Sequence, residues 1–180
     1  MIAEAVLDDG TAAWIWPLQS EDREALSEGY EHLSAITRYH RFLASVPHLS
    51  STLLDHLVDD VDGIDHVALA LVVIDVDHVG EPVGVARMIR YEQQPTAADV
   101  AVTVLDEWQG RGVATALLHE LIRQRPVGVT RVVTTVAADN GPSLAMLRRL
   151  GETTVTTAGI NRLDVVAELT IPHPTKMENV

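Results

Sequence analysis

The sequence predicts an α/β domain in which helices flank a mixed, mostly antiparallel β-sheet of about six or seven strands. Three observations lead to this prediction. Apolar residues in the first third of the chain have helical spacing, whereas β-branched runs typical of strands dominate the middle. Two of these runs follow each other across a turn, as in a hairpin. Farther along, a strand–helix–strand unit makes the sheet a mixed one.

The composition fits a single packed domain. The chain has 180 residues, of which 47% are hydrophobic and 22% are charged. These proportions suit a globular core and argue against disorder. We therefore expect residues 1–180 to form one domain.

The first third begins with a strand over residues 12–18, which Pro17 stops. Three segments with helical spacing follow, and a serine stands at or near the start of two of them, where its side chain can cap the helix. The predicted helices start at Ser20 and cover residues 35–45 and 50–61, with Ser20 and either Ser50 or Ser51 as caps.

The rest of the chain alternates strands with two helices. A turn at residues 77–80 joins the first two strands, and Gly151 is expected to cap the second helix. Residues 172–180 form a tail. The predicted strands are 66–76, 81–91, 97–105, 130–138, 152–157 and 161–171, and the predicted helices are 112–124 and 141–151.

The charge and residue usage exclude several functional classes. The formal net charge is −13, and the 13 lysines and arginines form no basic stripe, so we expect no nucleic-acid partner. The absence of cysteine excludes disulfides, thiolate metal sites and a cysteine nucleophile. The longest apolar run, residues 67–74, is far shorter than a membrane span, and the N-terminus lacks the pattern of a signal peptide. We therefore expect no membrane partner and a cytoplasmic location.

The histidines do not predict a metal site. Four of the eight histidines recur every eight residues, whereas ligand pairs on one helix face are three or four residues apart. We therefore expect no metal. These four are His32, His40, His48 and His56.

The segment "DEWQGRGVATALLHEL" at residues 106–121 predicts an anion site. A strand runs into a glycine-rich turn and then into a helix, whose first backbone N–H groups have no partner within the helix. Gly110 and Gly112 let a ligand approach the backbone, and Arg111 adds a positive charge. Neither the P-loop nor the dinucleotide motif is matched. Taken alone, the glycines also fit an ordinary strand-to-helix turn.

Two motifs resemble those of the GCN5-related N-acetyltransferases (GNAT family). "QGRGVA" is similar to the Q/R-x-x-G-x-G/A loop that grips the pyrophosphate of acetyl-CoA in that family, and "ADNGPSLAMLRRLG" is similar to its later asparagine-and-helix motif. The resemblance covers roughly residues 66–170. It implies a GNAT-like fold for a single N-acetyltransferase domain and acetyl-CoA as cosubstrate. The coenzyme-binding residues it implies are Val102, Val104, Gln109, Gly110, Arg111, Gly112, Val113, Ala114, Thr115, Asn140 and Ser143.

Three further stretches, "TRYHRF", "DHVALAL" and "ADVAVTVLDEWQGRG", resemble the catalytic domain of bacterial protein lysine acetyltransferases of the Pat type. This resemblance implies transfer of acetyl to a primary amine, with a protein lysine as the favoured acceptor. Two alternatives remain open: acetylation of a small amine or amino acid, and a non-catalytic module that binds acyl-CoA. A homodimer also remains open.

Acetyl transfer to an amine needs a base, because most of the amine is protonated at neutral pH. Asp99 is our candidate, since its position resembles that of a catalytic glutamate in the Pat-type pattern, although aspartate is one methylene shorter. A solvated aspartate at the start of a strand is the alternative. In a regular strand Asp99 and Val102 point to opposite faces, and a backbone irregularity would change that. Leu147 stands where many GNAT enzymes have a tyrosine that acts as the general acid, so no acid is assigned.

Overall fold

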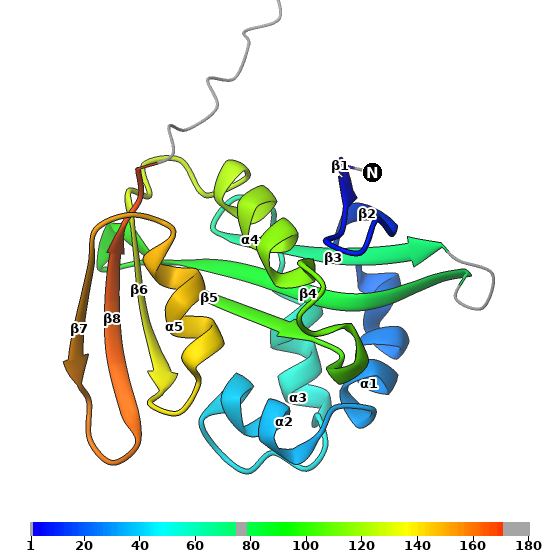
Figure 1. Ribbon diagram of the computed structural model, residues 1–180, viewed down its shortest axis with the longest axis horizontal. Helices are drawn as coiled ribbons and strands as arrows, with labels where there is room; N and C mark the ends of the chain where they lie inside the picture. Colours follow the sequence, from blue (N-terminus) through cyan, green and yellow to red (C-terminus); the bar gives the residue numbers. More distant parts are fainter. Residues whose placement is uncertain (1, 75–78, 171–180) are drawn as a thin grey trace, which may run out of the picture.

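In the computed structural model, which describes residues 2–74 and 79–170, one eight-stranded sheet runs through the molecule with helices on both faces (Figure 1). The strand order is β1-β2-β3-β4-β5-β6-β8-β7. Every pair of neighbours is antiparallel except β5 and β6, so the sheet is mixed and mostly antiparallel, as predicted. The strands are β1 (Ala3–Val6), β2 (Ala12–Pro17), β3 (His66–Ile74), β4 (Val79–Tyr91), β5 (Gln94–Val104), β6 (Arg131–Ala137), β7 (Thr153–Thr157) and β8 (Arg162–Glu168).

The helices also follow the predicted order. A 3-10 turn (Ser20–Asp22) precedes the first helix, a π-helical segment (Asp55–Asp59) continues the third, and a second 3-10 turn (Asp106–Trp108) follows β5. The helices are α1 (Arg23–Glu31), α2 (Ala35–Phe42), α3 (Ser51–Leu54), α4 (Val113–Arg123) and α5 (Gly141–Arg148).

Strand β1 is not predicted by the sequence. This strand has only four residues, and it pairs along one side with β2 at the edge of the sheet. Such a short segment carries little periodicity of its own, so its pairing partner decides its conformation. The sheet therefore has eight strands instead of the predicted six or seven.

Two predicted local features differ in the structure. Ser20 does not cap the first helix; the backbone N–H of Gln19 instead donates to the Asp22 carboxylate at 2.8 Å. Gly151 does not cap α5, which ends at Arg148. The predicted turn at 77–80 lies mostly outside the described residues, as does the predicted tail. Ser50, by contrast, caps α3 as predicted, because its hydroxyl accepts from the N–H of Leu53 at 3.2 Å.

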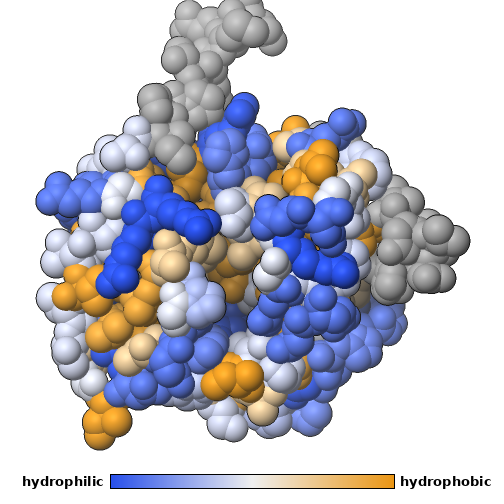
Figure 2. All heavy atoms as spheres, viewed as in Figure 1, coloured by the Kyte–Doolittle hydropathy of each residue, from blue (hydrophilic) through white to orange (hydrophobic). Residues whose placement is uncertain are grey.

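Each face of the sheet has its own core. One core joins α4 and α5 to the sheet and includes Leu117, Leu121 and Leu147, each at most 2% exposed. The opposite core lies under the N-terminal helices and includes Leu57 and Ala68. The surface in Figure 2 is mostly hydrophilic, with small hydrophobic patches between polar side chains. The two cores fix helices on both faces of one sheet, and the site described below lies where these layers meet.

Strands β5 and β6 pair over a very short length. The parallel ladder contains only the pairs Ala97↔Arg131 and Ala98↔Val132. Beyond them the two strands diverge, and Figure 1 shows β5 and β6 running apart like the arms of a V. The helix α4 connects the end of β5 to the start of β6, so the strand–helix–strand unit predicted from the sequence encloses this split.

We predict that Gly151→Ala destabilises the fold by about 3 kcal/mol, because overpacking against rigid backbone is costly. A Cβ at this position would lie 1.9 Å from the carbonyl oxygen of Glu168. Gly141→Ala is the control, since a Cβ there meets nothing within 4 Å. We expect the control to stay within about 1 kcal/mol of the wild type in urea unfolding. Equal stability of the two variants would contradict the close approach of residue 151 to β8.

Candidate functional site

The split between β5 and β6 exposes the backbone of β5. The hydroxyl of Thr134 on β6 donates to the carbonyl of Val100 at 3.4 Å, so this carbonyl faces β6. Because alternate residues of a strand direct their backbone groups to the same side, Val102 and Val104 also face the split. The carbonyl of Val104 there accepts from Gln109 Nε2 at 3.2 Å. The predicted coenzyme contacts at Val102 and Val104 are therefore backbone groups on the open side of β5.

The glycine turn at the open end of the split leads into α4. Gly110 and Gly112 have φ of 74° and 89°, in the left-handed region that favours glycine. Gly112 is the N-cap of α4, and the first hydrogen bond of the helix runs from Ala116 N–H to the Gly112 carbonyl at 2.9 Å. The N–H groups of the first helical turn precede this bond and have no partner within the helix. They form an anion-binding surface with the positive end of the helix dipole.

Most side chains of this turn point away from the anion-binding surface. Gln109 Nε2 lies 3.3 Å from the hydroxyl of Thr37 and also bonds to β5. The guanidinium of Arg111 stacks on Trp108 at 4.5 Å and pairs with Asp9 at 3.4 Å. The remaining three residues of the predicted set are Val113, which is 1% exposed, Ala114, which is partly buried, and Thr115, which is exposed. The turn therefore offers mainly its backbone to a ligand.

The space beside Gly112 is filled by the N-terminal hairpin. A Cβ at Gly112 would lie 2.9 Å from a carboxylate oxygen of Asp8, whereas a Cβ at Gly110 would meet nothing within 4 Å. The backbone N–H of Asp8 also donates to the carbonyl of Arg111 at 2.9 Å. The sequence analysis expected both glycines to make room for a ligand. The side-chain direction of Gly112 instead makes room for Asp8, so only Gly110 faces open space.

Asn140 and Ser143 lie at the start of α5. The side chain of Asn140 accepts from the backbone N–H of Ser143 at 3.1 Å and so caps the helix. Leu147, at the position of the family's tyrosine, is 2% exposed and belongs to the core. The later motif therefore supplies a capped helix end beside the split, and its leucine offers no proton donor.

Asp99 lies at the vertex of the split, directly after the last paired residue of β5, Ala98. The register between β4 and β5 is regular from Asp99 to Val104, and no bulge changes the aim of the aspartate. Burial raises the pKa of the Asp99 carboxyl, while Thr134 and Arg41 lower it by smaller amounts. A half-buried carboxylate with a raised pKa is a stronger base than an exposed one.

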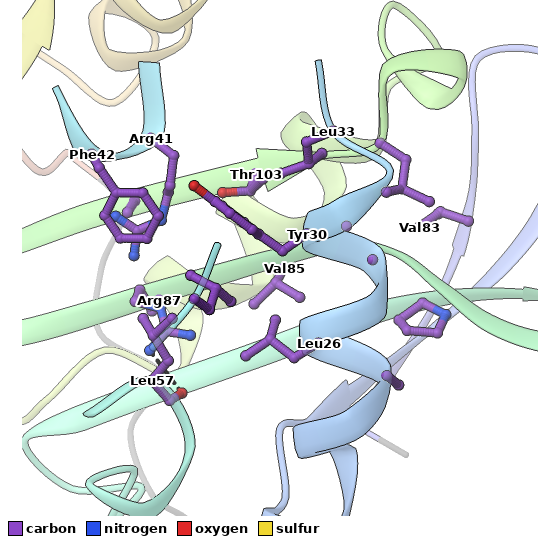
Figure 3. A pocket seen from close by; sticks show the side chains of 17 residues that line it. Leu26, Tyr30, Leu33, Arg41, Phe42, Leu57, Val83, Val85, Arg87 and Thr103 are labelled. Carbon is purple, nitrogen blue, oxygen red and sulfur yellow. Dashed lines mark hydrogen bonds between the residues drawn. The ribbon is translucent and has the colours of Figure 1, made fainter. Parts of the chain in front are cut away.

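The regular register of β5 puts Asp99 and Val102 on opposite faces. Ala101 and Thr103, which share the face of Asp99, line a pocket under α1 and α2 (Figure 3). The side chain of Val102 packs instead against the core on the α4 face. A reactant in this pocket would therefore approach the split from the side that carries the aspartate.

The pocket is mostly apolar and contains two arginines. The Tyr30 hydroxyl donates to the carbonyl of Val46 at 2.6 Å, which fixes the tyrosine over the cavity. Arg41 comes from α2 and Arg87 from β4, and Arg87 is 5% exposed. The apolar walls shown in Figure 3 include Leu26, Leu33, Phe42, Leu57, Val83 and Val85.

Asp106 connects the glycine turn to α2. Its carboxylate accepts from the N–H and hydroxyl of Ser34 at 2.8 and 2.7 Å, and from the hydroxyl of Thr37 at 2.8 Å. Burial alone would raise the pKa of Asp106, but these hydrogen bonds outweigh it and lower the pKa. Asp106 thus fixes the start of the helix that covers the pocket.

The other end of α2 reaches across the split. His40 Nε2 lies 3.3 Å from Asp139 after β6, and Arg162 at the start of β8 donates to the carbonyl of Leu43 at 2.7 Å. The sequence predicts that Asp106 shapes or caps the glycine loop, but not that it binds Ser34 and Thr37, and it predicts no role for Arg87, because these partners lie tens of residues away along the chain. The run "RYHRF" was the one available signal for Arg41.

The described part of the chain contains no group of three or more acidic or histidine side chains that could hold a metal ion. Within residues 2–74 and 79–170, no helix combines the length and apolar character that crossing a membrane requires.

Similar proteins include acetyltransferases of known sequence and of known structure. The acetyltransferase Pat of Mycolicibacterium smegmatis is 34% identical over 144 residues, which are 78% of this chain and 42% of Pat. The L-amino acid N-acetyltransferase AaaT of Escherichia coli is 32% identical over 111 residues, which are 59% of this chain and 64% of AaaT. The chain thus spans less than two thirds of each relative. The crystal structure of the GNAT domain of S. lividans PAT matches with a TM-score of 0.79 and 29% identity, covering 93% of this chain and 96% of that domain.

The model of the acetyltransferase (GNAT) family matches residues 34–151, which include the split, the glycine turn and the start of α5. This match covers well over half of the 180 residues. The fold similarity to the S. lividans domain extends over nearly the whole chain. The chain therefore belongs to the acetyltransferase (GNAT) family and has the α/β fold of that family.

Proposed function

We propose that the protein transfers the acetyl group of acetyl-CoA to a primary amine, with Asp99 as the general base. One observation carries the proposal: the sheet opens directly after Ala98, with a half-buried carboxylate at the vertex and an anion-binding helix end at the mouth. We also propose that residues 1–180 act as one N-acetyltransferase domain.

The pyrophosphate of the coenzyme binds in this proposal to the N–H groups between Gly110 and Thr115. The pantetheine arm follows the open side of β5, where the backbone groups of Val102 and Val104 face the split. An N–H of this edge polarises the thioester carbonyl, as oxyanion donors do in other acyl transfers. The start of α5, with Asn140 and Ser143, borders the same split.

Transfer requires an uncharged amine. Asp99 takes a proton from the acceptor ammonium, directly or through one water, and the amine nitrogen then attacks the thioester carbon. The C–N bond forms, the C–S bond breaks, and the coenzyme leaves as a thiolate that takes up a proton. Because Leu147 supplies no hydroxyl, the thiolate leaves in this proposal without help from that position.

The acceptor is open between two classes of amine. The similarity to Pat supports the predicted protein lysine, and the similarity to AaaT supports an amino acid. A raised carboxylate pKa at the vertex of the split supports a catalytic role rather than a module that only binds acyl-CoA. The homodimer and the cytoplasmic location remain predictions.

We predict that Gly112→Val weakens acetyl-CoA binding at least about tenfold, which corresponds to ~1.4 kcal/mol. Valine is strained at a φ of 89°, and its side chain would displace Asp8 and reshape the turn. Gly128→Val is a matched control, because its φ is also 89° but a Cβ there meets nothing within 4 Å. Calorimetry with acetyl-CoA should show a change in affinity for Gly112→Val alone. An unchanged affinity in a folded Gly112→Val protein would refute the placement of the coenzyme on this turn.

We predict that Asp99→Asn lowers kcat at least about 100-fold, the usual contribution of a general base. The affinity for acetyl-CoA should stay the same. Because the base acts when deprotonated and burial raises its pKa, kcat/KM of the wild type should fall with decreasing pH at a higher pH than an ordinary aspartate would give. This acidic limb should be absent from the variant.

The control for Asp99→Asn is Asp164→Asn, which changes an exposed carboxylate bonded to Thr135 on the neighbouring part of the sheet. The assay measures acetyl transfer through the release of the coenzyme thiol, with several amines as acceptors. If Asp99→Asn and Asp164→Asn both keep full activity and the same pH profile, Asp99 is a structural residue.

A further inference from the structure

Two arginines converge on one end of the pocket under α1 and α2. Arg41 belongs to α2 and Arg87 to β4, and Figure 3 shows their side chains entering the cavity from opposite sides at the same end. Arg87 is 5% exposed, so a charged group has been taken almost fully out of water. Arginine is rarely buried unless it is paired.

The hydrogen bonds of Arg87 use only one edge of its guanidinium. Nη1 donates to the carbonyl of Leu57 at 2.9 Å and to His66 Nε2 at 3.2 Å. His66 accepts at Nε2 because its Nδ1–H donates to the carbonyl of Asp60 at 3.1 Å. Across residues 2–74 and 79–170, neither Nε nor Nη2 of Arg87 has a hydrogen-bond partner in the protein. These donors remain available to a ligand.

The guanidinium of Arg41 also has no carboxylate in contact with it among the described residues. Its guanidinium stacks on Phe42 at 4.7 Å, and in the described parts of the chain it forms no ion pair within 4.0 Å. Its charge and that of Asp99 act on each other through space. Arg41 therefore lines the pocket and also interacts electrostatically with the proposed base.

The positive charge of Arg41 acts on Arg87. Burial first, and then the charge of Arg41, lower the pKa of Arg87 to about 9, which leaves it protonated at neutral pH. Two positive charges on one mostly apolar cavity are costly until an anion joins them. A carboxylate meets this need best, because guanidinium groups bind it through paired, charge-assisted hydrogen bonds.

We propose that the acceptor is an α-amino acid with an apolar side chain, and that Arg41 and Arg87 bind its carboxylate. This inference rests on the acetyl transfer proposed above and names the acceptor of that site. The apolar side chain lies against Leu26, Tyr30 and Val85, which line the cavity. The α-amine is one carbon away from the carboxylate, and so it lies near Arg41 on the side that faces Asp99.

A lysine side chain on a protein fits this pocket less well. Its ammonium would add a third positive charge near Arg41 and Arg87, and its stem carries no anion for them. The pocket is formed by residues of α1, α2 and the sheet. Apolar walls with a few convergent polar groups are typical of small-molecule sites.

The test compares amines that differ only in the carboxylate. The full chain is assayed with acetyl-CoA and either L-phenylalanine or phenethylamine, either L-leucine or isoamylamine, and a peptide with one internal lysine. Rates are expressed per concentration of free amine. We expect kcat/KM to be about 10- to 100-fold higher for each amino acid than for its decarboxylated partner, in line with one charge-assisted pair.

The variants Arg41→Met and Arg87→Met should remove this preference. We expect the ratio of kcat/KM for each amino acid to that for its decarboxylated partner to fall about 10- to 100-fold, because only the amino acid carries the carboxylate, while the affinity for acetyl-CoA stays unchanged. Arg90→Met is the matched control on β4, because Arg90 pairs with Asp65 outside the pocket. Arg41 is only half-buried, so Arg41→Met keeps the test decisive even where Arg87→Met does not fold.

Three outcomes overturn the inference. One is a decarboxylated amine that is as good an acceptor as its amino acid, and another is a preference for the lysine peptide. The third is an amino-acid preference that survives Arg41→Met. If no amine is acetylated although acetyl-CoA binds, the proposed function itself fails, and the acceptor assignment fails with it. A preference for the amino acids that both arginine variants abolish supports the assignment.

Discussion

The two residue pairs that join β5 to β6 control the geometry of the whole site. Because this parallel ladder stops at Ala98 and Val132, the backbone of β5 beyond it faces a widening gap instead of a neighbouring strand. Backbone groups in a sheet interior are otherwise paired, so an opened edge of this kind creates donors that a ligand can use. The aspartate at the vertex and the helix end at the mouth gain their proposed roles from the same opening.

The two halves of the site are mechanically linked. Asp106 receives hydrogen bonds from Ser34 and Thr37 at the start of α2, while Gln109 of the glycine turn also reaches Thr37. The helix that covers the acceptor pocket is therefore anchored to the turn that is proposed to hold the coenzyme. A change on one side of this link would therefore affect the other, because Thr37 bonds to both Asp106 and Gln109.

The charges that the protein presents along the site alternate from positive to negative to positive. The turn and the N-terminus of α4 present positive potential to a pyrophosphate, and Asp99 provides a negative group at the vertex. Arg41 and Arg87 then line the pocket under α1. In a chain with a net charge of −13, two arginines on one mostly apolar cavity are a local exception to the general charge balance. Removing such charges from water is costly to the fold, which is why an anionic ligand is proposed for them.

The sequence alone determined the order of the elements, the mixed sheet, the glycine turn before α4 and the family, because these depend on local periodicity and on short contiguous motifs. It could not predict strand β1, whose four residues are ordered by pairing with β2. Nor could it predict that a side chain at position 112 would point toward Asp8. Only the tertiary structure brought Arg41 and Arg87 together. These residues lie on different elements, and no local rule relates a helix in the first third of the chain to a strand in the middle. Distant contacts set which face each side chain meets, and those contacts exist only after the sheet and helices have packed.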